Sequence, residues 1–354
     1  MTALETLMRN FPAGGDAAIV TGVFNRRYLT GMQSSAGALL FTRDKARFII
    51  DSRYIELARR TVPCEAVLQG KLYGQIADFL KEAGARTLLV ENDVCTLEEL
   101  SAYKEKLSGV EISESGALSE QIWKQRRVKT AAELNAMRRA QEVTDKVFEA
   151  IIGKIAAGRT EREIALEMEF MGRKMGMEGV SFSFIVAGGA NSSMPHAVPG
   201  EYAIKKGDLI TMDFGFVAEG YCSDMTRTVA VGYPSEKQKE VYRTVIGAQD
   251  AAFAKIAPGV PCREVDAAAR SLIDGGSYRG LFGHGLGHGL GLEVHESPRF
   301  NEVSEATLEI GMAMSVEPGI YIPKEFGVRV EDVVFVTQEG FENITRSPKE
   351  LLIL

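Results

Sequence analysis

Short runs of apolar residues alternate with amphipathic segments over residues 18–122 of the chain. The runs GALLFT (37–42) and ARFIID (46–51) predict two strands joined by the turn RDK. YGQIADFLKEAGA (73–85) repeats its apolar residues at helical spacing and ends at a glycine, which predicts a helix. RTLLVEN (86–92) predicts a buried strand. This alternation of strands and helices indicates an α/β domain, which we place at residues 1–124.

A long amphipathic stretch at residues 122–158 marks a change in pattern and predicts two helices in succession. Thr130 precedes Glu133 by three residues, and Thr160 precedes Glu163 by three; both pairs have the capping-box spacing of a helix start. Strands and loops are predicted over residues 181–231, helices over 235–272, and strands from 312 to the C-terminus. We therefore predict a second domain of the α+β class at residues 125–354.

Composition narrows the class of protein. The chain has 354 residues, enough for two or three domains of roughly 150 residues each. Its net charge of −7, without a long basic run, argues against nucleic acid or an anionic membrane as a partner. Neither a secretory signal nor an apolar run long enough to span a membrane is evident. The four cysteines form no Cys-x-x-Cys pair, which favours reduced thiols in a cytoplasmic protein.

One glycine-rich ribbon, FGHGLGHGLGLEVHE (282–296), contains three of the four histidines: His284, His288 and His295. The spacing of His284 and His288 is that of a helical zinc site. However, each glycine costs a helix about 1 kcal/mol relative to alanine, so the five alternating glycines would cost about 5 kcal/mol. The ribbon is therefore predicted to be extended or looped, with its backbone passing close to another segment. The fourth histidine is His196, in SMPHAVPG.

Two aspartates lie in the segment LITMDFGFVAEGYCSDMTRTVAVG (209–232). If Ala218 and Glu219 centre a hairpin, Asp213 and Asp224 lie directly opposite each other on one face. Two unpaired carboxylates in that position would repel each other, and a bound cation would remove the repulsion. The alternative, two solvated aspartates on an exposed hairpin, is disfavoured by the apolar residues around Asp213.

Two glutamates near the C-terminus have similar surroundings. Glu317 follows an apolar run in AMSVEPGIYI, and Glu331 is predicted to lie within a strand in GVRVEDVVFV. Arg329 precedes Glu331 by two residues and would lie on the same face of that strand. Either glutamate alone would indicate an edge residue; together with the two aspartates and a histidine they indicate a cation site.

These residues and their order resemble the pita-bread dinuclear metallopeptidases, a family that includes methionine aminopeptidase, aminopeptidase P, prolidase and the metal-free creatinase. The matching motifs are MDFG, SDMTRT, GHGLGHGLGLEVHE, VEPGIY and VRVEDV, in this order. The segments NRRYLTGMQSS and DSRY resemble the smaller N-terminal domain of the creatinase, prolidase and aminopeptidase P branch. The resemblance implies a pita-bread catalytic domain preceded by a creatinase-like α/β domain, and a homodimer.

The resemblance also implies a role for each residue of the set. Asp213 would bind one metal, Asp224 and Glu331 would bridge two metals, and His288 and Glu317 would complete the second metal's ligands. His196 and His295 match histidines that contact the substrate and stabilise the tetrahedral intermediate. The positions that match supporting residues around the ligands are His284, Tyr321 and Arg329.

The ligand chemistry agrees with this resemblance. Four carboxylates and one imidazole form an oxygen-rich set that suits manganese, cobalt or iron better than a thiolate-type zinc site. We predict two divalent cations, with manganese or cobalt as the first choice and iron or zinc next. Two such cations can activate a water and polarise a scissile carbonyl, with Glu317 moving the proton. The predicted reaction is amide hydrolysis.

Within this family the chain resembles most the enzymes that cleave the Xaa-Pro bond, and we predict an Xaa-Pro dipeptidase acting on proline-containing peptides. Arg299, in HESPRF, could bind the free carboxylate of a dipeptide; alternatively it packs on its loop and pairs with a surface acid. The principal alternative is an aminopeptidase P that acts on longer peptides.

Three further hypotheses fit the sequence less well. A non-catalytic binding protein of this fold would lack ligands that are all present here. A creatinase-like reaction without metals would not need the four carboxylates. Methionine aminopeptidase normally lacks the N-terminal domain.

Overall fold

The computed structural model describes residues 1–354, which fall into two compact units, Met1–Arg126 and Arg127–Leu354. The helices of the first unit are α1 (Ala3–Arg9), α2 (Val23–Thr30), α3 (Ile55–Thr61), α4 (Leu72–Ala83), α5 (Leu97–Lys106) and α6 (Ala117–Arg127), the last of which ends one residue past the boundary. Its strands are β1 (Ala17–Val20), β2 (Ala38–Phe41), β3 (Ala46–Ile50), β4 (Glu65–Leu68), β5 (Thr87–Val90) and β6 (Glu111–Ser113).

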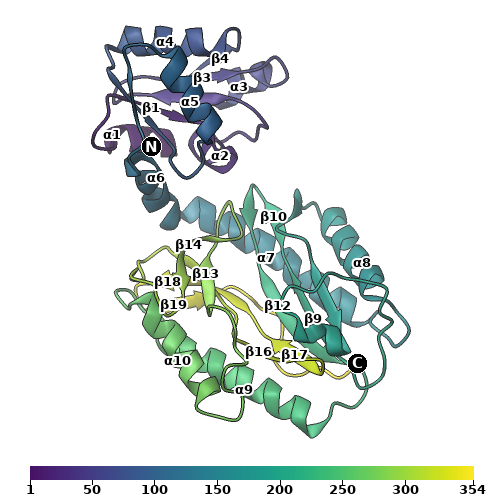
Figure 1. Ribbon diagram of the computed structural model, residues 1–354. Coiled ribbons are helices and arrows are strands. Elements are labelled where there is room, and N and C mark those ends of the chain that lie inside the picture. The colour runs from purple at the N-terminus through teal and green to yellow at the C-terminus, as the bar shows by residue number, and fades with distance from the viewer. The chain divides into compact units, whose positions relative to one another are not determined.

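The six strands of this unit form one mixed sheet in the order β4-β3-β2-β1-β5-β6. Strands β1, β2 and β3 pair antiparallel, while β4, β5 and β6 join in parallel. Successive residues of β1 point into different cores: Ala18 and Val20 pack with α1, α2 and α6, whereas Ala17 and Ile19 pack with α4 and α5. The unit is therefore a sheet covered by helices on both faces (Figure 1).

The predicted elements of this unit are confirmed. The hairpin of β2 and β3 pairs Phe41 with Ala46 across the turn that the sequence indicates. Helix α4 ends at Gly84, which adopts the left-handed conformation, with φ of 64°, that favours glycine at a helix C-terminus. Strand β5 is buried and pairs in parallel with β1.

The second unit contains four helices, one 3₁₀ turn and thirteen strands. Its helices are α7 (Ala131–Ile152), α8 (Glu161–Lys174), α9 (Glu236–Phe253) and α10 (Cys262–Asp274), and the 3₁₀ turn is η1 (Gly189–Ser193). Its strands are β7 (Gly179–Val180), β8 (Ile185–Gly188), β9 (Leu209–Phe214), β10 (Phe216–Ala218), β11 (Tyr221–Cys222), β12 (Met225–Ala230), β13 (Gly287–Gly289), β14 (Glu296–Phe300), β15 (Ala313–Val316), β16 (Gly319–Ile322), β17 (Phe326–Arg329), β18 (Asp332–Thr337) and β19 (Gly340–Asn343).

Two helix pairs cover the strands of this unit (Figure 1). Helices α7 and α8 pack on β8, β9 and β12 through one apolar core, which includes Phe148 and Phe214. Helices α9 and α10 pack on β15, β16 and β18 through another, which includes Val245 and Met314. Both predicted capping boxes are present, with Thr130 capping α7 and Thr160 capping α8. The strands thus form an interior layer, and the functional residues lie on it.

The register of the β9–β12 hairpin differs from the prediction. The turn is formed by Glu219 and Gly220, both with positive φ, and Asp213 faces Thr226. Two adjacent left-handed residues give a turn whose twist matches that of the flanking strands. The prediction that Asp213 and Asp224 lie directly opposite each other is therefore wrong. Because the pairing shifts by two residues, however, the aspartates become diagonal neighbours on the same face.

Three of the predicted acids lie where one strand ends and another begins. Asp224 lies between β11 and β12, Glu317 between β15 and β16, and Glu331 between β17 and β18. The prediction that Glu331 lies within a strand is wrong by this assignment. At each of these breaks the chain passes from one sheet to another, since β15 and β18 belong to a five-stranded sheet and β16 and β17 to a two-stranded one. The breaks point side chains from different sheets toward a common space.

The cysteines Cys64, Cys95, Cys222 and Cys262 are free thiols, as the sequence predicts. None of the helices combines the length and the apolar character that crossing a membrane requires.

Candidate metal centre and cleft

A cleft of about 510 Å³ opens in the second unit. It is lined by every predicted site residue except Tyr321, whose hydroxyl hydrogen-bonds the lining residue His284. Phe182, Phe184, Ile185 and Val198 provide an apolar wall beside the polar residues. A largely apolar cleft with a few convergent charged groups is the usual form of a small-molecule site.

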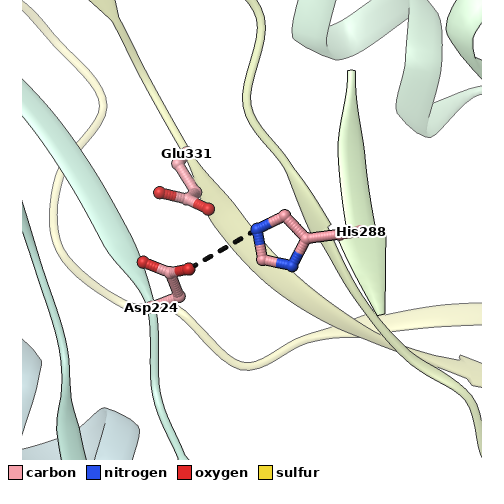
Figure 2. Close-up of side chains that lie close together, drawn as sticks. All are labelled: Asp224, His288 and Glu331. Atoms are coloured by element: carbon pink, nitrogen blue, oxygen red, sulfur yellow. Dashed lines mark ion pairs between the residues drawn. The ribbon is translucent and has the colours of Figure 1, made fainter. Parts of the chain in front are cut away.

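Asp224, His288 and Glu331 meet at the floor of this cleft (Figure 2). One candidate ligand atom from each residue lies within 4.8 Å of those of the other two, and all three residues are buried. His288 Nε2 lies 3.7 Å from Asp224 Oδ2, beyond hydrogen-bond distance, so a cation can be held between these atoms. The charges of Asp213 and Glu317 raise the pKa of Asp224, so these two acids lie next to the group.

The imidazole of His288 is held by its own backbone. Its Nδ1 lies 3.0 Å from the carbonyl oxygen of Gly289, so Nδ1 carries the proton that it donates there. Its Nε2 points at the carboxylates, 3.3 Å from Glu317 Oε1 and 3.7 Å from Asp224 Oδ2. A histidine whose Nδ1–H is bound by a carbonyl presents Nε2 as a metal ligand.

Three carboxylate oxygens at this position are buried without a hydrogen-bond partner: Asp213 Oδ1, Asp224 Oδ1 and Glu331 Oε1. Each unsatisfied buried acceptor costs about 1–3 kcal/mol, and more when it is charged. Native folds rarely keep three such atoms together without a ligand. These residues therefore fit a cation site, and oxygen-rich ligation of this kind suits hard divalent cations.

The electrostatics of the acids support the same conclusion. Burial raises the pKa of Asp224 well above its usual value, and the charges of Glu331 and Asp213 raise it further. Burial, followed by the charges of Glu317 and Asp213, likewise raises the pKa of Glu331. Carboxylates that repel one another in this way are stabilised in their charged form by a cation between them.

Glu317 behaves differently from the other acids. Burial acts to raise its pKa, but the hydrogen bond and charge of His288 outweigh burial and lower the pKa to about 2. Ser315 also directs its hydroxyl at Glu317 Oε1, at 3.4 Å. Glu317 is therefore the acid of the group that is most readily ionised.

Arg329 connects two of the candidate ligand residues, Asp213 and Glu331. Its Nη2 donates to Asp213 Oδ2 at 2.6 Å, and its Nε donates to the hydroxyl of Thr226 at 3.1 Å. That hydroxyl donates in turn to Glu331 Oε2 at 2.8 Å. One oxygen of each of the two acids is thereby fixed, and the other is left free. Arg329 and Glu331 both line the cleft, although Glu331 lies beyond the end of β17.

His284 and Tyr321 extend this network. Arg329 Nη1 donates to the Tyr321 hydroxyl at 2.8 Å, and that hydroxyl lies 2.9 Å from His284 Nε2. His284 Nδ1 donates to the carbonyl of Gly285 at 2.8 Å, so Nε2 accepts the proton of Tyr321. The two side chains support Arg329 from below and take no place among the candidate ligands.

The glycine ribbon is extended at β13, looped on either side of it and closely packed, as predicted. A Cβ on Gly287 would lie 2.1 Å from the carbonyl oxygen of Ser315, although Gly287 has no positive φ. Glycine is needed there for close approach of two backbones. Helix α10 holds the ribbon from the other side: Arg270 donates to the carbonyls of Phe282 and His284, and Asp266 accepts from the backbone of Leu286.

Three predicted residues stand at the rim of the cleft and are exposed: His196, His295 and Arg299. The ring of His295 stands edge-on to that of His288, with 4.4 Å between centroids. Partial burial and the neighbouring His288 lower the pKa of His295 to about 4, so His295 is neutral near pH 7. Arg299 faces His288 across the β13–β14 pair.

Sequence reasoning missed three residues that position a candidate ligand or the glycine ribbon. Thr226 lies within the motif SDMTRT, but nothing in one sequence distinguishes its hydroxyl from that of Thr228. Asp266 and Arg270 lie four apart on a helix, a spacing also typical of solvated ion pairs. Their contacts with the ribbon depend on tertiary structure.

Comparison with known families agrees with this geometry. Residues 135–338 match the model of metallopeptidase family M24, and residues 3–128 match the creatinase/prolidase N-terminal domain. Among curated proteins, the uncharacterised peptidase YqhT of Bacillus subtilis is 42% identical over 99% of both chains.

Solved structures of whole chains are similar as well. The Xaa-Pro dipeptidase from Bacillus anthracis superposes with a TM-score of 0.95 at 42% identity, over 99% of both chains. The X-Pro aminopeptidase from Thermotoga maritima superposes with a TM-score of 0.90 at 32% identity, over 96% of this chain and 98% of the other. The predicted fold, a creatinase-like domain followed by a pita-bread catalytic domain, is confirmed. This chain belongs to metallopeptidase family M24 and is a metal-dependent peptidase.

Proposed function

We propose that this protein hydrolyses the Xaa-Pro bond of dipeptides with two divalent cations, in the cytoplasm and as a homodimer. The observation that carries the proposal is the group of buried carboxylates, with three unpartnered oxygens, at the floor of a cleft of peptide size. The names of similar proteins support the substrate class, and the free thiols agree with a reducing compartment. We propose domain limits of 1–124 and 125–354.

The residues that would hold the cations are the five predicted ligands: Asp213, Asp224, His288, Glu317 and Glu331. The cations, when bound, supply Lewis-acid activation of the scissile carbonyl and of the attacking water. Since the ligand set is oxygen-rich, we propose manganese or cobalt, followed by iron or zinc.

The remaining steps belong to the side chains. Glu317 accepts a proton from the attacking water at its carboxylate and passes it to the leaving proline nitrogen. His295, neutral near pH 7, donates a hydrogen bond to the carbonyl oxygen as negative charge develops there. His196 contacts the substrate from the rim, and the apolar wall formed by Phe182 and Phe184 excludes water.

An aminopeptidase P acting on longer peptides is the second candidate, because one similar structure is an X-Pro aminopeptidase. We favour the dipeptidase because Arg299 stands on the cleft wall opposite His288, where its guanidinium can bind a carboxylate. A non-catalytic role is disfavoured by the complete ligand set.

The experiment is hydrolysis of Ala-Pro, Ala-Pro-Ala, Met-Ala-Ala and Ala-Ala, each with added manganese or cobalt. The proposal predicts cleavage of Ala-Pro faster than Ala-Pro-Ala, and negligible cleavage of the peptides without proline. Faster cleavage of Ala-Pro-Ala indicates the aminopeptidase. Preference for Met-Ala-Ala contradicts both.

A further inference from the structure

The loop that carries His196 over the cleft is an irregular segment, residues 189–199, between β8 and the next buried stretch. It begins with η1, and its tip exposes Met194, His196 and Val198. Only Ala197 of the tip is buried, against Ile185. The contacts of the tip side chains alone do not account for a fixed position of His196.

The base of this loop is closed by Glu161, the first residue of α8, which is only 1% exposed. Its Oε1 accepts from the backbone N–H of Gly188 at 2.8 Å and from the side-chain amide of Asn191 at 2.9 Å. Its Oε2 accepts from the backbone N–H of Gly200 at 3.0 Å. One carboxylate therefore joins the residue before the loop to the residue after it.

A carboxylate is the side chain that this geometry requires. The three donors occupy both oxygens, and a glutamine in the same position would offer one acceptor oxygen and present an N–H₂ group to the remaining donor. Because Glu161 lies in the first turn of α8, the helix dipole favours its negative charge. Charge-assisted hydrogen bonds of this kind are about twice as strong as neutral ones.

The opposite side of the loop is attached to the ligand network. Gly327, in β17, donates its N–H to the hydroxyl of Ser192 at 2.9 Å. Arg329 donates to the carbonyl of Pro195, the residue before His196, at 3.3 Å. The loop is thus fixed between α8 and β17. On the α8 side, the fully buried acid that contacts it is Glu161.

We propose that Glu161 is a positioning residue: by joining Gly188, Asn191 and Gly200 it holds the 189–199 loop so that His196 faces the cleft. This inference rests on the proposed function, in which His196 contacts the substrate. Glu161 itself lies outside the cleft lining and touches none of the reacting atoms.

The test compares Glu161→Gln with Glu163→Gln, each alone and combined with His196→Ala, in the full-length metal-loaded protein. Glu163 lies two residues away, and glutamine retains its capping box with Thr160, so Glu163→Gln is a matched control. Three quantities are measured: kcat/KM on Ala-Pro, metal content, and amide hydrogen exchange of residues 188–200.

We expect Glu161→Gln to lower kcat/KM by on the order of 10-fold to 10²-fold, the scale expected for misplacing a substrate contact by about 1 Å. Exchange over residues 188–200 should become faster while metal content stays unchanged. In the His196→Ala background the same substitution should change kcat/KM by less than about twofold, because coupled residues are not additive. Glu163→Gln should resemble the wild type in all three measurements.

The inference is overturned if Glu161→Gln lowers kcat/KM equally with and without His196, since the effect would then not act through His196. It is also overturned if His196→Ala leaves kcat/KM unchanged or if exchange of the loop does not change. If the wild type cleaves no peptide, the proposed function fails, and the exchange measurement alone decides whether Glu161 holds the loop.

Discussion

The floor and the rim of the cleft place their functional side chains in opposite ways. At the floor, Asp224, His288 and Glu331 are buried and surrounded by protein. At the rim, His196 and His295 are exposed and make few contacts of their own. The floor is therefore enclosed by protein, and the rim side chains are open to solvent.

Although its side chains are exposed, the rim has a fixed backbone, and a buried acid holds each part of it. Glu161 closes the loop of His196. Glu296, next to His295, pairs with Lys129 at 3.1 Å, with both side chains almost fully buried. At the floor, Asp224 and Glu331 keep unpartnered oxygens and repel each other, whereas Glu161 and Glu296 behind the rim are paired with donors. The floor thus stores repulsion that a bound cation would relieve.

The largest effect should come from removing a floor carboxylate. Asp224→Asn or Glu331→Gln should reduce turnover of Ala-Pro to near the background rate, because the cation site loses a ligand. Either change also removes like-charge repulsion, so the metal-free variant should unfold at a higher temperature than the metal-free wild type. Peptide assays and thermal unfolding of metal-free samples check both results. Unchanged turnover would show that the acid is no ligand.

Substitutions of His288 at the floor and of His295 at the rim should have different effects. His295→Ala should lower kcat by on the order of 10²–10³, as for loss of one oxyanion donor, with metal content retained. His288→Ala should instead lower metal occupancy. Kinetics paired with elemental analysis distinguish the two. Equal metal loss in both variants would mean that their roles are wrongly assigned.

A smaller effect should follow from loosening the floor without removing a ligand. Thr226→Val removes the donor to Glu331 and the acceptor for Arg329, and should weaken metal binding about 10–100-fold. Thr226→Ser keeps the hydroxyl and serves as the control. Calorimetric titration with manganese measures the affinities. Equal affinities in Thr226→Val and the wild type would contradict the role of Thr226 in holding Glu331.

The smallest effect should come from Arg299 at the rim. Arg299→Ala should lower kcat/KM on Ala-Pro about tenfold, the lower end for losing a hydrogen bond to a charged group, and leave Ala-Pro-Ala nearly unchanged. Assays of both peptides at equal concentration test this. If Ala-Pro-Ala is the better substrate and Arg299→Ala changes neither rate, the predicted preference for dipeptides is wrong.

Local patterns were sufficient to predict most of the fold. Capping boxes at Thr130 and Thr160 and the glycine that ends α4 depend on residues a few positions apart. The β9–β12 register was predicted wrongly because it depends on Glu219 adopting positive φ, which non-glycine residues seldom do. The error was two residues, so both aspartates kept the predicted face.

The site was only partly predictable, for a related reason. The acids could be identified because four carboxylates in apolar, sheet-like sequence are costly unless something binds them. The supporting residues could not be identified: Thr226 contacts Glu331, which is distant in sequence, and Arg270 holds backbone carbonyls of the glycine ribbon. Glu161 carries no sign of its role, since its spacing resembles that of any acid in a first helical turn.

Hydrolysis by this protein should depend on two divalent cations held by the buried acids at the cleft floor. Elemental analysis of the purified protein before and after chelation, with Ala-Pro hydrolysis assayed on the same samples, tests this dependence without any substitution. We predict up to two divalent ions per chain, loss of activity when they are removed, and recovery with manganese or cobalt. Full activity in protein shown to be free of metal would contradict the proposed role of the acids.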